Sequence, residues 1–130
     1  MGEHFNIGGG FRVMDAVSLT SSGTIYSKSV QMDFVKFMGL RIATVTSTVG
    51  AMKVSLQESN YPPATEGAAD SNFVVPDGMD NSGIIYASLA TSLVSHIQVF
   101  PVPASHARLR FSAVTASTPI AVTAEIWLQG

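Results

Sequence analysis

The sequence predicts an all-β fold: an antiparallel β-sandwich, jelly-roll-like, of about eight strands. The first observation is that apolar and polar residues alternate with a period of two in many short runs, whereas helical spacing is scarce. The second is that clusters of Gly, Pro, Ser and Asn separate these runs. The length of 130 residues suits a single domain of this kind.

The alternating runs define the expected strands in chain order. Each run places its apolar residues on one face, as expected for a strand with one buried side. The runs cover 11–19, 40–48, 52–57, 96–99, 108–113 and 120–129. Turns are expected where Gly, Pro, Ser, Asn or Asp interrupt them, at 21–23, Gly39, Gly50, 61–63, 76–78 and 117–119.

Residues 60–83 depart from the alternating pattern. This segment is rich in Pro, Gly, Ala and Asp, and only Phe73, Val74 and Val75 resemble a strand. We expect a long loop that crosses one end of the sandwich and is held by that short strand. Loops of this length in compact domains are usually functional or mobile.

The N-terminal residues form a separate unit in this interpretation. Three consecutive glycines at 8–10 would lose too much backbone entropy inside a strand, so they predict a hinge. Residues 1–10 are therefore expected to be a flexible arm, and residues 11–130 the sandwich domain. The arm has two apolar anchors, Phe5 and Ile7.

The last two alternating runs are expected to pair as a hairpin. The register that closes a short loop between them places Arg110 opposite Glu125 and Arg108 opposite Trp127. A charge pair and a cation–aromatic pair are both favourable across strands. In this register Trp127 points away from the core.

Composition excludes several classes of function. Charged residues make up 12 % of the chain, about half the usual share. The net charge of −2 and the pI near 5.8 argue against nucleic acid as a partner. The chain has no cysteine, so it has no disulfide framework, thiolate metal site or thiol nucleophile.

Charge is unevenly distributed along the chain. Residues 1–53 carry five basic and three acidic side chains, residues 54–107 carry no basic and five acidic ones, and residues 108–130 carry two basic and one acidic. The middle segment is therefore either an acidic, solvated loop or a surface that meets a basic neighbour in an assembly.

Catalytic and metal-binding patterns are not found in the sequence. His4, His96 and His106 do not have the spacing of metal ligands. The sequence also lacks the Gly-x-Ser-x-Gly motif of a nucleophilic serine. The oxygen-rich turn around Asp77 and Asp80, which includes Asn81, lacks the spacing of a calcium loop. We therefore expect no enzymatic activity, no metal and no cofactor. A hydrolase domain with a site hidden within the sandwich is kept as an alternative hypothesis.

No membrane segment is expected. Residues 81–107 contain no Asp, Glu, Lys or Arg, but Pro101, Pro103 and several polar residues interrupt this stretch. The first residues lack the basic start and apolar run of a signal peptide. The sequence therefore predicts no membrane partner.

The surface is predicted to form protein contacts. Interfaces are depleted in Lys, Glu and Asp and enriched in aromatic residues and Met, and this chain has six Met. The candidate interface residues are Phe5, Ile7, Arg108, Arg110 and Trp127. We expect a homo-oligomer, a dimer or trimer; the alternative is a monomer in which its own loop covers Trp127.

Two stretches carry a resemblance to a known group. Residues 52–60, Met-Lys-Val-Ser-Leu-Gln-Glu-Ser-Asn, followed later by Ala107-Arg-Leu-Arg-Phe, a turn and a final alternating strand, are similar to segments of small β-sandwich virion proteins of tailed bacteriophages. The likeness in layout covers roughly residues 40–130. Tyr61-Pro62-Pro63 stands where such proteins often have a Trp.

This resemblance implies a capsid decoration or cement protein that binds and stabilises the shell of the major capsid protein. Such a protein is located at the capsid surface of the virion and is assembled in the host cytoplasm. A head–tail or tail-fibre component is an alternative within the same group. A carbohydrate-binding module, with Trp127, Tyr61 and the Asp/Asn-rich loop as a sugar platform, is an alternative outside it.

Overall fold

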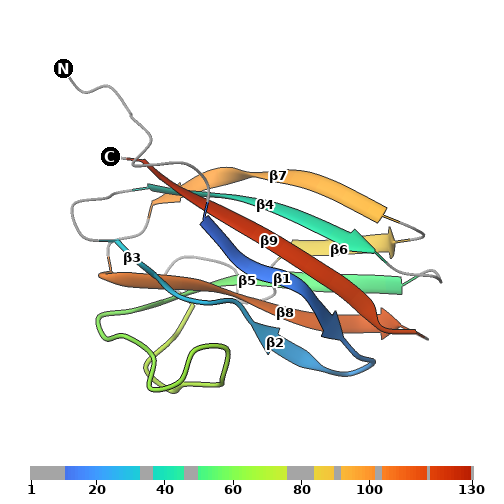
Figure 1. Ribbon diagram of the computed structural model, residues 1–130, viewed down its shortest axis with the longest axis horizontal. Coiled ribbons are helices and arrows are strands. Elements are labelled where there is room, and N and C mark those ends of the chain that lie inside the picture. The colour runs from blue at the N-terminus through green and yellow to red at the C-terminus, as the bar shows by residue number, and fades with distance from the viewer. Residues whose placement is uncertain are drawn as a thin grey trace.

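The structure, a computed structural model, describes residues 11–32, 37–45, 50–75, 84–89, 92–101, 104–116 and 118–129. These residues form strands and no helix, which confirms the all-β prediction (Figure 1). The strands are β1 (Phe11–Leu19), β2 (Thr24–Tyr26), β3 (Val30–Gln31), β4 (Phe37–Val45), β5 (Gly50–Ser59), β6 (Ile84–Leu89), β7 (Ser92–Pro101), β8 (His106–Ala116) and β9 (Ile120–Gln129). The described residues therefore include no helix that could span a membrane.

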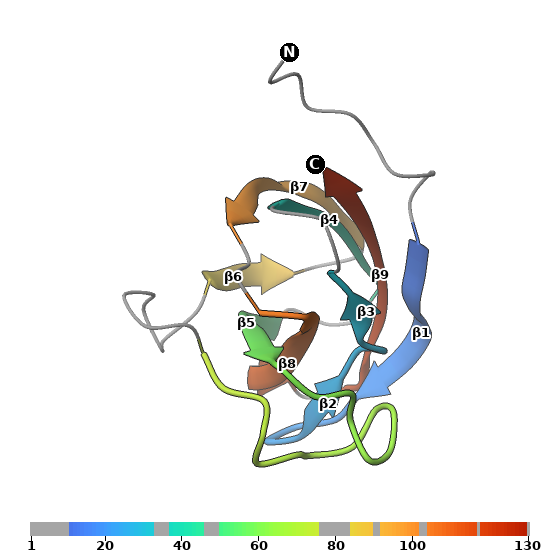
Figure 2. The ribbon, with the colours of Figure 1, turned by 90° about the vertical axis from the view of Figure 1, so that its left-hand side faces the viewer.

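The strands form two antiparallel sheets. The first sheet has the order β1-β9-β4-β7, and the second has the order β2-β8-β5-β6, with the short β3 paired to β8 beside β2. Strands that follow one another in the chain therefore mostly belong to different sheets. Figure 2 shows the two sheets facing each other, with β1 and β7 at opposite sides of the first.

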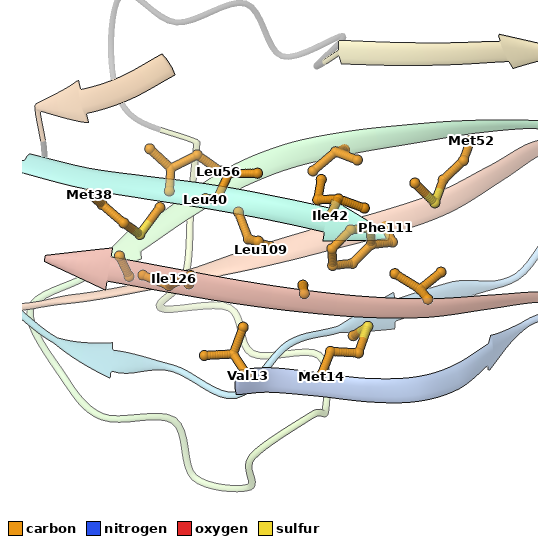
Figure 3. Close-up of a cluster of buried hydrophobic side chains, with 14 of the residues drawn as sticks. Val13, Met14, Met38, Leu40, Ile42, Met52, Leu56, Leu109, Phe111 and Ile126 are labelled. Atoms are coloured by element: carbon orange, nitrogen blue, oxygen red, sulfur yellow. The ribbon is translucent and has the colours of Figure 1, made fainter. Parts of the chain in front are cut away.

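The core lies between the two sheets (Figure 3). On β9, Ile126 and Leu128 are buried whereas Trp127 between them is partly exposed, as period-two alternation requires. Leu109 and Phe111 of β8 enter the same core from the second sheet. Burial of each large apolar side chain stabilises the fold by about 1.5–3 kcal/mol.

The predicted hairpin of the last two strands is wrong. β8 pairs with β5, β2 and β3, whereas β9 pairs with β1 and β4. Glu125 forms ion pairs with Arg41 at 3.5 Å and Arg12 at 3.9 Å rather than with Arg110. The reason is that two consecutive strands with apolar faces can also face each other across a core, which alternation does not distinguish from pairing within one sheet.

On one side of the molecule, a backbone hydrogen bond joins the two sheets. β1 contains two irregularities, between Arg12 and Met14 and between Met14 and Val17. Beside them, the backbone N–H of Lys28, between β2 and β3, donates to the carbonyl of Val13 at 2.9 Å. The predicted arm, residues 1–10, lies outside the described residues.

Candidate functional site: an anchored loop over the second sheet

Arg108 lies on the outer face of the second sheet, yet it is 1 % exposed. Its neighbours Ala107 and Leu109 both enter the core, so Arg108 points to the opposite side of β8. Residues 60–75, which we call the anchored loop, cover it there. The loop leaves β5 and runs along the outside of the second sheet, at the lower left of Figure 1.

The guanidinium of Arg108 lies between two aromatic rings. Its Cζ is 4.3 Å from the ring centroid of Tyr26, on β2, and 4.3 Å from that of Phe73, in the anchored loop. Phe73 is itself 4 % exposed. Cation–aromatic contacts are strongest when water is excluded, so this stack joins the loop firmly to the sheet.

Hydrogen bonds complete the surroundings of this cation. Nε of Arg108 donates to Oε1 of Gln57 at 3.0 Å, and Nη1 donates to the carbonyl of Ala68 at 2.6 Å. Nη2 is buried and has no hydrogen-bond partner among the described residues. Gln57 belongs to β5 and Ala68 to the loop, so one side chain connects three separate segments.

Two carboxylates of the loop accept hydrogen bonds from other groups of the same protein. Glu66 accepts hydrogen bonds from the backbone N–H of Ser29 at 2.7 Å and from its hydroxyl at 2.6 Å. Asp70 accepts from the backbone N–H groups of Asn72 at 2.9 Å and Ala64 at 3.1 Å. These two members of the acidic middle segment therefore hold the loop in shape.

The electrostatics of the loop follow from these contacts. Hydrogen bonds from the backbone of Asn72 and then Ala64 hold the pKa of Asp70 below its ordinary value, and Arg108 adds a smaller effect in the same direction. Burial lowers the pKa of Arg108, while Tyr26 and Asp70 favour its charged form. An Arg guanidinium remains protonated in proteins, so the structure encloses a permanent cation.

The anchored loop also presents apolar side chains to solvent. Val74 pairs with Glu58 through two backbone hydrogen bonds of 2.8 and 3.0 Å, so the loop is held at the predicted place, by an isolated bridge rather than by a strand over residues 73–75. The side chain of Val74 is 55 % exposed and that of Tyr61 is 63 % exposed. The backbone N–H of Tyr61 donates to the hydroxyl of Ser59 at 3.0 Å. An aromatic and an aliphatic group are thus displayed on an ordered backbone.

This arrangement suits binding to another macromolecule. A loop that is already ordered loses little entropy when it binds, and exposed aromatic side chains are common binding hot spots. Among the described residues, no group of three or more His, Asp or Glu is placed to hold a metal ion.

The structure separates the predicted neighbours Arg108 and Trp127, because β8 and β9 belong to different sheets. Trp127 does point away from the core, as predicted, and is partly exposed on the outer face of the first sheet. Its indole covers Gly39, where an added Cβ would overlap the ring. The turn expected at Gly39 is therefore wrong: this glycine lies inside β4 and leaves room for the indole.

Of the other interface residues predicted from the sequence, the structure describes Arg110 alone. Arg110 is partly exposed on β8, in register with Tyr26 and Ser55. Phe5 and Ile7 lie outside the described residues. The oxygen-rich turn of residues 77–81 also lies outside them.

Sequence reasoning missed the environment of Arg108. Nothing in the local pattern connects it with Tyr26, Gln57 or Ala68. One partial signal was present, since Phe73 is the one aromatic residue in the strand-like part of the predicted loop.

Comparison with known proteins gives little similarity. No protein-family model matches the chain, and no curated protein matches it. Among solved structures, the chain is similar to a family GH115 4-O-methyl-α-glucuronidase with specificity for decorated arabinogalactans, at 12 % sequence identity and a TM-score of 0.47. The match covers 96 % of this chain and 17 % of that one.

Proposed function

We propose that the protein is a structural component of a virus particle, a capsid decoration or cement protein that binds and stabilises the shell of the major capsid protein. The observation that carries the proposal is the anchored loop, which is hydrogen-bonded to the second sheet and leaves Tyr61 and Val74 exposed. In this role the buried cation of Arg108 has a mechanical function, because it keeps the contact surface in one conformation.

We also propose that the two sheets form a jelly roll. The order β1-β9-β4-β7 opposite β2-β8-β5-β6, with the chain crossing repeatedly between the sheets, supports this assignment. Jelly rolls are frequent in viral capsid proteins and in lectins. Since a fold alone does not determine function, the anchored loop is what favours a shell contact over other roles.

The contact is expected to be mainly apolar. Glu66 and Asp70 are occupied by hydrogen bonds within the protein, so they are poorly placed to attract a basic partner. Tyr61 and Val74 are instead available to lose water on contact. Burial of such side chains at the centre of an interface supplies much of its binding free energy.

The two aromatic residues of the sugar-platform alternative, Trp127 and Tyr61, extend from different sheets. Trp127 lies on the outer face of the first sheet, next to Gly39. Tyr61 follows β5 of the second sheet and is bonded to Ser59. Aromatic residues that stack on one sugar chain must share a surface, so the attachment of these two residues to different sheets favours a shell contact over a sugar platform.

Particle binding tests the proposal. Shells of the virus that encodes the chain, assembled without it, are mixed with purified protein and sedimented, and the bound fraction is measured over a concentration series. The double variant Tyr61→Ala, Val74→Ala is expected to raise the apparent Kd by about tenfold or more. The matched control is Val45→Ala, because Val45 is 60 % exposed on the other sheet.

The control variant is expected to bind as the unchanged protein does. Unchanged protein that does not sediment with shells would overturn the proposed function, and equal binding of the double variant would remove the loop from it. Binding to an immobilised mixture of oligosaccharides in place of shells, abolished by Tyr61→Ala, would instead support a carbohydrate-binding module.

A further inference from the structure

β7 forms one edge of the first sheet. Among the described residues, β7 pairs with β4 alone and ends the strand order β1-β9-β4-β7. Figure 2 shows it on the side away from β1. An edge strand offers a row of backbone N–H and C=O groups that can pair with another strand.

The other edges carry features that oppose such pairing. β1 is interrupted by two irregularities, includes the charged residues Arg12 and Asp15, and receives a hydrogen bond from Lys28. β2 and β3 are three and two residues long. Irregular, charged or very short edge strands are the usual ways in which proteins prevent association through their sheets.

β7 differs over most of its length. Residues 92–97 pair with residues 45–40 of β4 without interruption, and the shift in register comes only after Ile97. This run, Ser-Leu-Val-Ser-His-Ile, contains no Asp, Glu, Lys, Arg, Pro or Gly, and His96 is its one titratable residue. Six regular residues without a formal charge form a suitable template for an added strand.

β6, the edge strand of the second sheet on this side, is shorter. It has six residues, and its pairing with β5 shifts register between Gly50 and Met52. Only four of its residues are register partners of β5. β7 is therefore the longest uninterrupted edge that the described strands offer.

We propose that residues 92–97 of β7 pair antiparallel with the same residues of a second copy of the chain. A two-fold axis at this edge would join the two first sheets, of four strands each, into one continuous sheet. The occupant is a second copy because a two-fold axis at the centre of the run places Val94 and Ser95 near the same residues of the other copy. A charge at the centre would then lie near a like charge, and this run has no Asp, Glu, Lys or Arg.

This inference extends the proposed function by naming the surface through which copies associate, but its evidence is the edge strand itself. The test uses the purified chain without shells. Failure of self-association and failure of shell binding are therefore separate results.

The experiment measures molar mass by light scattering during size exclusion over a concentration series. At high concentration we expect twice the 13.7 kDa of the chain. Val94→Lys, in the middle of the run and in register with Ala43, is expected to raise the dimer Kd by about tenfold or more. Val17→Lys is the matched control, since Val17 is 39 % exposed on β1, at the other edge of the same sheet.

The control is expected to dimerise as the unchanged protein does. Hydrogen exchange of the unchanged chain gives a second measurement that does not depend on a variant folding: amides of β7 should become more protected as concentration rises, and those of β1 should not. A chain that stays monomeric at every concentration, equal dimerisation of folded Val94→Lys, equal losses in both variants, or concentration-dependent protection in another strand would overturn the proposal.

Discussion

Arg108 occupies a strand position that alternation assigns to solvent, and it is nonetheless among the most buried side chains of the described protein. A buried cation is tolerated only where other groups replace its water. Here two rings and two oxygen acceptors do so, from Tyr26, Phe73, Gln57 and Ala68. The residue therefore contributes through packing as much as through charge.

Removing this side chain should destabilise the protein. Arg108→Ala leaves a cavity between the rings and deprives two acceptors of their donor, so we expect the free energy of unfolding to fall by about 3 kcal/mol. Arg108→Met fills part of the space without a buried charge and should cost less. Urea denaturation measures the change in the free energy of unfolding for both variants.

Arg110→Ala, on the same face but partly exposed, is the control and should change stability by about 0.5 kcal/mol or less. Equal stability of Arg108→Ala and the unchanged protein would contradict the assignment.

At the scale of the element, the anchored loop is held at several separated points. Glu66 binds Ser29, Arg108 binds Ala68, and Val74 pairs with the backbone of β5. Asp70 closes a turn within the loop. Because each attachment is local, weakening one should increase opening of the loop without unfolding the sheets.

Asp70 provides a test that depends on pH. Its pKa is lower in the folded protein than its ordinary value of 3.8, so its stabilising contribution is present above 3.8 and is lost as the pH falls through the lower folded value. Asp70→Asn should therefore increase amide exchange of residues 60–75 at neutral pH, and the difference from the unchanged protein should vanish in acid. Asp15→Asn, on β1, should leave exchange in the loop unchanged. A difference that persists at a pH well below 3.8 would show that the carboxylate charge is not the cause.

At the scale of the whole molecule, the two sides of the sheet pair are unlike. On one side Lys28 links the segment between β2 and β3 to β1. On the other side β6 and β7 end their sheets without pairing with each other among the described residues. The two proposed contact surfaces, the anchored loop on the second sheet and the β7 edge of the first, therefore lie on different sheets, and the proposals do not require them to compete.

The N-terminal arm adds a further prediction at this scale. Deleting residues 1–9 should leave the melting temperature unchanged and lower occupancy on shells, because Phe5 and Ile7 each contribute about 1.5–3 kcal/mol if they are buried on a neighbour. Occupancy is measured by sedimentation with shells that lack the protein. Phe5→Ala with Ile7→Ala in the full chain should reproduce the loss. Equal occupancy of the truncated and intact proteins would exclude the arm from binding.

The sequence by itself determined the all-β class, most strand positions and the direction of Trp127. These properties are local, because side chains alternate along a strand with a period of two whatever the strand pairs with. The attachment of the loop near Phe73 and Val74 could also be predicted, since a short apolar run in a polar segment needs a buried or paired position.

Only the tertiary structure decided which strands are neighbours and what surrounds Arg108. The alternation of apolar and polar residues in β9 is the same whether β9 lies beside β8 or across the core from it. The local sequence therefore does not indicate which sheet β9 joins. Burial of Arg108 depends on Ala68, forty residues away in sequence, and on Tyr26 in another strand. Such contacts form because the anchored loop returns over the second sheet, and that path is set by the packing of the whole molecule rather than by any single segment.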